Sequence, residues 1–235
     1  MSFDKKTLAA SAVALAAALV LSACGGGGGS DGGGTTTPVA VKPNPKPTAP
    51  TTACSAAGIA ASNASTASAT VCMLTSDGEV VIELYADKAP ATVANFLKYV
   101  RDGFYNNTVF HRVPRDFVVQ GGGFITGGYA KTATYNPIVL ESNKGLSNVR
   151  GTIAMARTDL PNSATSQFFF NTVDNSSCLD FGKLICDSTG NGYAVFGKVI
   201  SGLPTIDAIN VEARWVSNAE VPATEVLLYW AQQLK

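Results

Sequence analysis

The chain has 235 residues, of which 17 are Lys or Arg and 17 are Asp or Glu, so its formal net charge is zero. Without a basic surplus or a polybasic run, the composition argues against nucleic acid and anionic lipid headgroups as partners. A single histidine and the lack of any Cys-x-x-Cys spacing also argue against a metal site.

The first 23 residues have the layout of a bacterial export signal. Two lysines precede an apolar run from Leu8 to Leu21. This run is shorter than the ~20 apolar residues that a bilayer-spanning helix needs, so a transmembrane helix is less favoured. The ending LSAC resembles the lipobox of bacterial lipoproteins, which implies that Cys24 carries a lipid and begins the mature chain. An ordinary secretory signal followed by a chance cysteine is the alternative.

Residues 24–53 are first glycine-rich and then proline-rich. Such a segment holds too little apolar surface to offset the entropy lost on ordering, so we interpret it as a flexible tether. We expect the protein to be exported and held at the cell envelope by the lipid on Cys24 alone. Gly25 is not the aspartate that marks inner-membrane lipoproteins, which favours the outer membrane, with the protein facing the periplasm.

Residues 54–235 are long enough for one domain with a proper core. Their four cysteines form an even set, which favours disulfides in an exported chain. Four cysteines allow three pairings, and proximity in the sequence favours Cys54–Cys72 and Cys178–Cys186. Two buried free thiols are the alternative for the second pair.

The order of predicted elements in this domain indicates its fold class. Residues 69–85 form two β-rich runs around Ser76-Asp77-Gly78, which predicts a hairpin. Apolar residues then recur at helical spacing between Pro90 and Gly103, residue types that suit a helix start and stop. Further strands, a second helix at LPTIDAIN and a last strand follow in chain order: TVFHRV, FVVQGG, GTIAMA, SQFFFNT, YAVFGKVI and TEVLLYWAQQL. Many short strands with two helices indicate a β-barrel or sandwich.

Hydrolytic and nucleotide-binding motifs do not fit the chain. His111 could serve as the base of a Ser–His–Asp site, but no G-x-S-x-G motif exists. The glycine run GGGFITGG lacks the Lys-Ser/Thr ending of a phosphate-binding loop. Thr126 stands where the third glycine of G-x-G-x-x-G belongs.

Three separated blocks resemble the cyclophilin family of peptidyl-prolyl cis–trans isomerases, most of all its bacterial, periplasmic branch. They are GFYNNTVFHRVPRDFVVQGGGF, GTIAMARTDLPNSATSQFFFNTVDN and YAVFGKVISGL, and the resemblance runs from about Ala69 to the C-terminus. It implies a mainly β fold, a closed eight-stranded antiparallel β-barrel capped by two α-helices. It also implies a cofactor-free isomerase whose partners are proline-containing polypeptides. We expect a monomer.

The resemblance assigns catalysis to Arg112, with Phe117 and Gln120 beside it. Rotation about an X–Pro bond must break amide resonance, against a barrier of ~18–20 kcal/mol. As the bond twists, the lone pair localises on the proline nitrogen, and a donor aimed at that nitrogen stabilises the twisted amide more than the planar one. Arginine suits this role because it stays protonated and holds its donors in a rigid fork. His111 is then expected to be a wall residue rather than a base.

Further substrate-binding positions follow from the same resemblance. Phe117, Phe169 and Leu179 match the pocket that holds the proline ring, while the neighbours of Phe169 in the strand should point the other way. The complete set implied to bind substrate is His111, Val118, Met155, Ala156, Arg157, Gln167, Phe169, Leu179 and Tyr193.

The sequence departs from the family at several of these positions. Val118 replaces a methionine, Tyr193 often a histidine, and Cys178 an aromatic residue that helps to hold cyclosporin. Arg115-Asp116 replace a Pro-Gly pair, so the resemblance does not predict the local geometry of the loop near Arg112. Two other functions stay open: a proline-peptide-binding chaperone that depends little on catalysis, and a structural envelope protein, which the intact Arg112, Phe117 and Gln120 set argues against.

Overall fold

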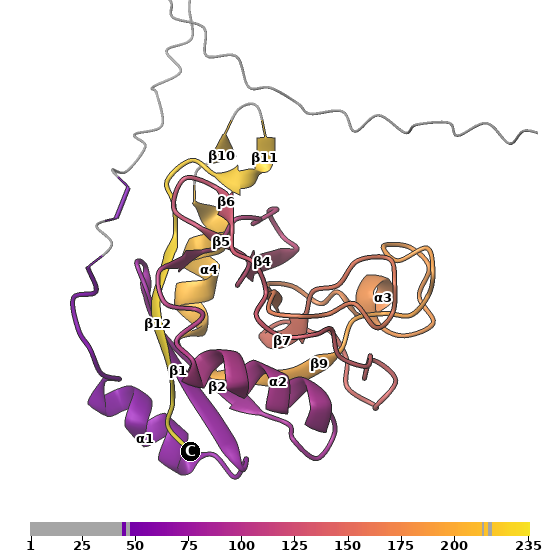
Figure 1. Ribbon diagram of the computed structural model, residues 1–235, viewed down its shortest axis with the longest axis horizontal. Coiled ribbons are helices and arrows are strands. Elements are labelled where there is room, and N and C mark those ends of the chain that lie inside the picture. The colour runs from indigo at the N-terminus through magenta and orange to yellow at the C-terminus, as the bar shows by residue number, and fades with distance from the viewer. Residues whose placement is uncertain (1–43, 46–47, 213, 216–217) are drawn as a thin grey trace, which may run out of the picture. The chain divides into compact units, whose positions relative to one another are not determined.

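The computed structural model describes residues 44–45, 48–212, 214–215 and 218–235 (Figure 1). The predicted signal peptide, Cys24 and most of the predicted tether lie outside these residues. Within the described part of the chain, no helix is long and apolar enough to cross a membrane.

A curled antiparallel sheet of ten strands forms the centre of the domain, in the order β4-β8-β7-β9-β2-β1-β12-β3-β5-β6. A separate two-stranded sheet pairs β10 with β11. The strands are β1 (Ala69–Thr75), β2 (Gly78–Leu84), β3 (Thr108–Val109), β4 (Val118–Gly121), β5 (Phe124–Ile125), β6 (Tyr129–Ala130), β7 (Thr152–Met155), β8 (Phe168–Asn171), β9 (Val195–Ser201), β10 (Arg214–Trp215), β11 (Asn218–Pro222) and β12 (Leu227–Gln233). The predicted hairpin corresponds to β1 and β2, and the predicted last strand to β12.

The expected closed barrel of eight strands is wrong for this chain. The sheet has ten strands, and its end strands are β4 and β6. One isolated bridge joins the segment after β3 to β4: the backbone N–H of Gln120 donates to the carbonyl of Arg112 at 2.8 Å, and the reverse bond measures 3.4 Å. One residue later, the N–H of Val113 donates to the carbonyl of Glu220 in β11 at 2.6 Å. The chain therefore leaves the main sheet for the β10–β11 hairpin before a longer ladder can form.

Four helices accompany the sheet in the described residues: α1 (Ala56–Ala64), α2 (Pro90–Arg101), α3 (Ser176–Leu179) and α4 (Leu203–Val211). The two predicted helices are confirmed as α2 and α4. Helix α2 starts at Pro90 and ends in a Schellman motif, in which Gly103 has a φ of 64° and its N–H donates to the carbonyl of Val100 at 3.0 Å. At the other end, the buried carboxylate of Glu141 accepts hydrogen bonds from the N–H groups of Ala91 and Thr92 at 3.2 and 2.8 Å.

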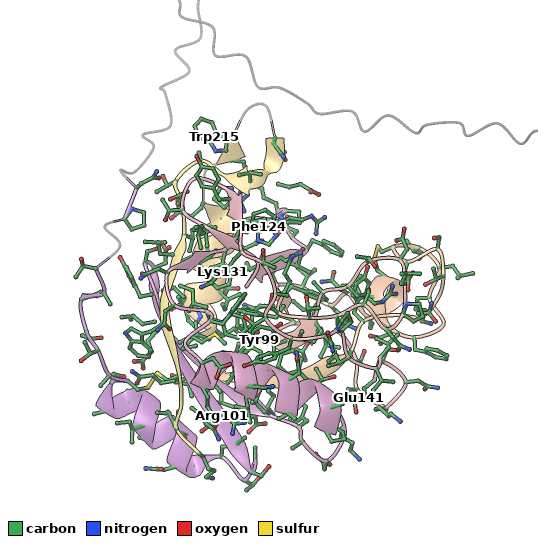
Figure 2. The ribbon with its side chains drawn as sticks, viewed as in Figure 1. Tyr99, Arg101, Phe124, Lys131, Glu141 and Trp215 are labelled. Carbon is green, nitrogen blue, oxygen red and sulfur yellow. A yellow bond between two sulfur atoms is a disulfide. The ribbon has the colours of Figure 1, made fainter. Side chains whose placement is uncertain are left out.

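An aromatic core fills the space between α2 and the concave face of the sheet. Phe96 of α2 lies with its ring centroid 5.6 Å from that of Phe168 and 5.0 Å from that of Phe196. Tyr99, one helical turn further on, is also fully buried (Figure 2). Phe168 and Phe170 point into this core, whereas Phe169 packs in a second cluster on the other face of β8. The alternation predicted for this strand is confirmed, and it frees one aromatic ring for a surface pocket.

Two disulfides join the cysteines in the pairs favoured by sequence proximity. Cys54–Cys72 ties the start of the domain to β1, with 6.1 Å between Cα atoms. Cys178–Cys186 closes a loop that begins in α3, with 5.1 Å between Cα atoms.

Candidate active site

An open pocket of about 450 Å³ collects most of the predicted site residues. Its walls come from the segment after β3, from β4 and β8, and from the segments that follow β7 and precede β9. Nine of the twelve residues predicted to act on or bind substrate line it, together with Cys186: Arg112, Phe117, Val118, Gln120, Ala156, Arg157, Phe169, Leu179 and Tyr193. Residues as far apart in sequence as Arg112 and Tyr193 therefore meet at one site.

The floor of the pocket is apolar. Phe169 packs against the ring of Tyr193 with 5.6 Å between centroids, and the two rings are nearly perpendicular. Val118 and Leu179 are buried in the same cluster, and Phe117 lies against it. A floor of this kind can take a small apolar ring such as that of proline.

Arg112 and Gln120 form the polar edge of the pocket. The Arg112 side chain is 35% exposed, and its Nη1 lies 3.5 Å from Oε1 of Gln120. The Gln120 amide in turn donates from Nε2 to Oε1 of Gln167 at 3.0 Å. Gln167 does not line the pocket but orients a residue that does. The isolated bridge between Arg112 and Gln120 sets the two side chains beside each other.

Two other predicted residues lie outside this pocket. His111 lines a different hollow together with Phe124 and Trp215, and its ring lies 4.2 Å from that of Phe124. Met155 is buried in the aromatic core. The reason in both cases is the alternation of side chains along extended chain, which sends His111 and Arg112, or Met155 and Ala156, to opposite faces.

His111 is partly buried, and its shifted pKa leads to a prediction about stability. Burial lowers the pKa of His111 from 6.5 to about 4, against the opposing effect of a backbone contact at Val109. The unfolded chain therefore takes up a proton at pH values where the folded chain does not, and the free energy of unfolding should fall as the pH drops from 6.5 towards 4. In urea unfolding, we expect the free energy of unfolding of the wild type to fall relative to that of His111→Gln as the pH drops over this range, because Gln does not titrate. A difference that is the same at pH 7.5 and pH 4.5 would contradict the assignment.

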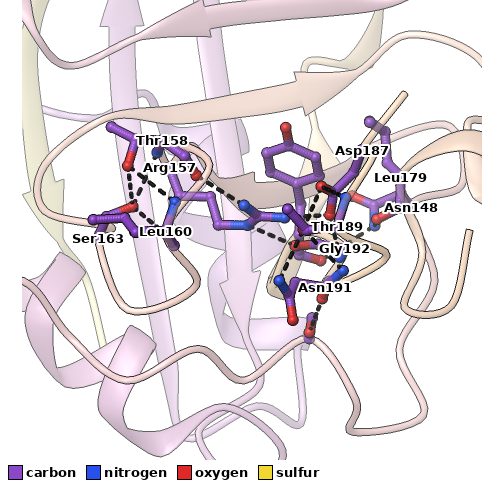
Figure 3. A network of polar contacts seen from close by, with 12 residues as sticks. Asn148, Arg157, Thr158, Leu160, Ser163, Leu179, Asp187, Thr189, Asn191 and Gly192 are labelled. Carbon is purple, nitrogen blue, oxygen red and sulfur yellow. Dashed lines mark hydrogen bonds and ion pairs between the residues drawn. The ribbon is translucent and has the colours of Figure 1, made fainter. Parts of the chain in front are cut away.

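Arg157 was predicted as part of the groove segment; it lines the pocket, and its guanidinium is buried in the protein. It forms an ion pair with Asp187, and the two side chains are 1% and 4% exposed. Its Nε donates to the carbonyl of Gly192 at 2.9 Å, and the guanidinium lies 4.7 Å from the ring centre of Tyr193 (Figure 3). Burial acts to raise the pKa of Asp187, but hydrogen bonds from Thr189 and Gly192 and the charge of Arg157 outweigh it, so the pKa lies below its ordinary value. Arg157 thus holds the loop before β9 against the pocket.

The disulfide loop 178–186 is attached to the domain through Asp180, near its start. Asp180 accepts hydrogen bonds from the N–H and the side-chain amide of Asn148 at 2.7 and 2.9 Å. Leu179 and Cys186, near the two ends of the loop, both line the pocket. The loop therefore forms the pocket wall on the side where the family carries an aromatic residue.

We expect loss of this disulfide to affect both stability and substrate binding. Replacing Cys178 and Cys186 by serine should lower the free energy of unfolding by roughly 2.5 kcal/mol, given the eight-residue separation. It should also raise KM for short proline peptides, with little change in kcat, because the wall loosens while Arg112 stays in place. Removal of Cys54–Cys72, at a distance from the pocket wall, is the matched control: it should lower stability by ~3 kcal/mol and leave KM unchanged. Equal KM values in the two variants would refute the role of the loop.

Several residues that shape the site carry no clear signal in the sequence. Asp187 lies 30 positions after its partner Arg157 in the sequence. Glu220 lies 108 positions after Arg112, which it contacts.

The departure at Arg115-Asp116 is accommodated because Asp116 adopts a φ of 52°, as a glycine would. Its N–H donates to the side chain of Asn210 at 3.1 Å.

The fold and the pocket define a mainly β protein with an open pocket, where arginine and glutamine lie at the edge of an apolar floor. Residues 70–230 match the family model described as cyclophilin type peptidyl-prolyl cis-trans isomerase/CLD. The chain belongs to this family, and it is a cyclophilin-type peptidyl-prolyl cis–trans isomerase.

Similar proteins support the assignment over most of their length. Peptidyl-prolyl cis-trans isomerase B of Escherichia coli (strain K12) is 50% identical over 157 residues, which cover 66% of this chain and 93% of that protein. Peptidyl-prolyl cis-trans isomerase A of Dickeya dadantii (strain 3937) is 44% identical over 174 residues, covering 73% and 88%. A crystal structure of a cyclophilin-type isomerase of Cryptosporidium parvum, solved in the presence of the dipeptide Ala-Pro, superposes with a TM-score of 0.58 at 25% identity and covers 69% of this chain and 96% of that one.

Proposed function

We propose that this isomerase accelerates rotation about X–Pro bonds in exported polypeptides and that Arg112 supplies the decisive interaction. The observation that carries the proposal is the position of Arg112 beside Gln120 at the edge of an apolar pocket. The prolyl ring would lie on Phe117, Phe169 and Leu179. The carbonyl of the preceding residue would accept a hydrogen bond from the amide of Gln120.

Catalysis then requires only that the twisted amide be bound more tightly than the planar one. The guanidinium donates towards the proline nitrogen as its lone pair localises, which offsets part of the ~18–20 kcal/mol barrier. No covalent bond forms and no proton is transferred. His111, with a pKa of about 4, stays neutral near pH 7 and has no part in the reaction. The rate should therefore be flat between about pH 5.5 and 8.

The site of action that we propose is the periplasmic side of the cell envelope, with the protein held there by a lipid on Cys24. Support comes from the LSAC sequence, the glycine- and proline-rich stretch behind it, and the two disulfides of the domain, which suit an oxidising compartment. Three acyl chains would exceed what stable membrane anchoring needs.

Metabolic labelling with a fatty acid tests the anchor. The wild-type protein should incorporate the label and sediment with membranes, whereas Cys24→Ser should do neither. If the wild-type chain is exported but remains unlabelled, the lipoprotein assignment is wrong.

One observation favours an additional chaperone role. Phe181, Leu184 and Ile185 of the disulfide loop are exposed, at 51%, 67% and 79%, next to the wall of the pocket. Exposed apolar side chains beside a peptide groove could bind unfolded chains without turnover. Refolding of a protein limited by proline isomerisation separates the two roles: a catalyst accelerates it at substoichiometric amounts, whereas a holdase acts only at stoichiometric amounts.

A further inference from the structure

We infer that Glu220 is a positioning residue for Arg112. The carboxylate of Glu220 fixes the plane of the Arg112 guanidinium so that the free donors of the guanidinium face the pocket. The inference rests on the proposed role of Arg112. Glu220 comes from β11 and lies outside the three blocks of sequence that carry the resemblance to the family.

The contact between the two side chains is bidentate. Nε and Nη2 of Arg112 donate to the two carboxylate oxygens of Glu220 at 2.9 and 3.0 Å. Paired bonds of this kind define the orientation of both planar groups. They occupy one edge of the guanidinium and leave Nη1 on the side of Gln120. The donors that remain available are therefore those on the side of the pocket.

Glu220 is itself held in place through the backbone. Its carbonyl accepts from the N–H of Val113 at 2.6 Å, and its own N–H donates to Oδ1 of Asn218 at 3.0 Å. On the other strand of the hairpin, Nε of Arg214 donates to the carbonyl of Val113 at 2.6 Å. The β10–β11 hairpin is thus attached to the chain one residue after Arg112, and the carboxylate is presented from a fixed backbone.

Folding stability does not explain this pair. The side chains of Arg112 and Glu220 are 35% and 48% exposed, and ion pairs with this exposure contribute little to stability. An arginine at the mouth of a pocket, by contrast, has many rotamers. Restricting them before substrate binds lowers the entropy lost in reaching the transition state.

The test is Glu220→Gln, which keeps the size of the side chain but removes its charge and one acceptor. With a short X–Pro peptide, kcat should fall roughly 10-fold, while KM should change less than about twofold and Tm should stay within about 2 °C. Glu220→Asp, which keeps the charge, should retain more activity than Glu220→Gln. In an Arg112→Ala background, Glu220→Gln should have no further effect, because the two residues act as one unit.

Asp207→Asn is the matched control. Asp207 binds Nη2 of Arg150 with both carboxylate oxygens, at 2.9 and 2.7 Å, and the two side chains are 43% and 42% exposed. This variant should keep wild-type kcat. A Glu220→Gln variant with wild-type kcat would overturn the inference, and a more active one would show that the carboxylate competes with substrate for Arg112. Inactivity of the wild type itself would instead contradict the proposed function.

Discussion

Replacing Arg112 with alanine is expected to lower kcat/KM for a short X–Pro peptide on the order of 100-fold, which corresponds to ~3 kcal/mol of transition-state stabilisation. The loss should fall mainly on kcat, because the apolar floor that binds the proline ring stays intact. The fold should also stay intact, since the ion pair that the substitution removes is half-exposed and contributes little to stability. A peptide isomerisation assay with purified protein, combined with thermal unfolding, measures both quantities.

His111→Gln is the neighbouring control for this experiment. His111 faces a different hollow from Arg112, so its replacement should change kcat/KM less than about threefold. If His111→Gln were the more damaging of the two changes, the division of roles between these adjacent residues would be reversed.

Asp187→Asn is expected to be the most destabilising conservative substitution near the site. The substitution leaves the guanidinium of Arg157 buried without a counter-charge. Removing one partner of a buried ion pair in this way lowers the free energy of unfolding by ~3–5 kcal/mol. The loop before β9 should loosen together with the wall formed by Tyr193, because Arg157 also contacts that ring. Urea unfolding should therefore show a lower midpoint, and KM for proline peptides should rise in the fraction that remains folded.

The exposed pair of Arg150 and Asp207 again gives the comparison for this second prediction. Asp207→Asn should cost less than ~1 kcal/mol, since water screens a pair of this exposure. If the two substitutions destabilised the chain equally, the buried pair would not hold the loop as we describe.

The elements with strong local patterns were predicted well. The Asp-Gly turn of β1–β2, the amphipathic period of α2 and the alternation around Phe169 are each set by near neighbours in the sequence. Helix α1 was missed because its alanine-rich sequence has almost no apolar face; Ser55 caps it by accepting a hydrogen bond from Gly58, and Glu79 in turn accepts one from Ser55. The count of short strands predicted a β-barrel or sandwich, and only the resemblance to the family specified a closed barrel of eight strands. In this chain Val113 bonds to β11 instead of extending the bridge between Arg112 and Gln120.

The site was predicted to the extent that it resembles the family. Nine of the twelve positions meet in the pocket, whereas His111, Met155 and Gln167 do not line it. His111 and Met155 face other parts of the protein because a sequence match does not say on which face of a strand a side chain lies. The two carboxylates that hold the arginines in place could not be found in this way. Asp187 and Glu220 act through contacts between distant segments, and their own neighbourhoods in the sequence, CDSTG and NAEVP, are typical of ordinary turns and edge strands.

The central claim is that this chain is a catalyst of prolyl rotation, and exchange NMR on a short X–Pro peptide tests it most directly. With the protein at a small fraction of the peptide concentration, cross-peaks between the cis and trans forms should grow on a timescale of milliseconds to seconds, far faster than the uncatalysed tens to hundreds of seconds. The equilibrium ratio of the two forms should stay unchanged, because a catalyst lowers the barrier without shifting the populations. Exchange at the uncatalysed rate, or a shift in the ratio that appears only at stoichiometric protein, would identify a binding protein and contradict the account.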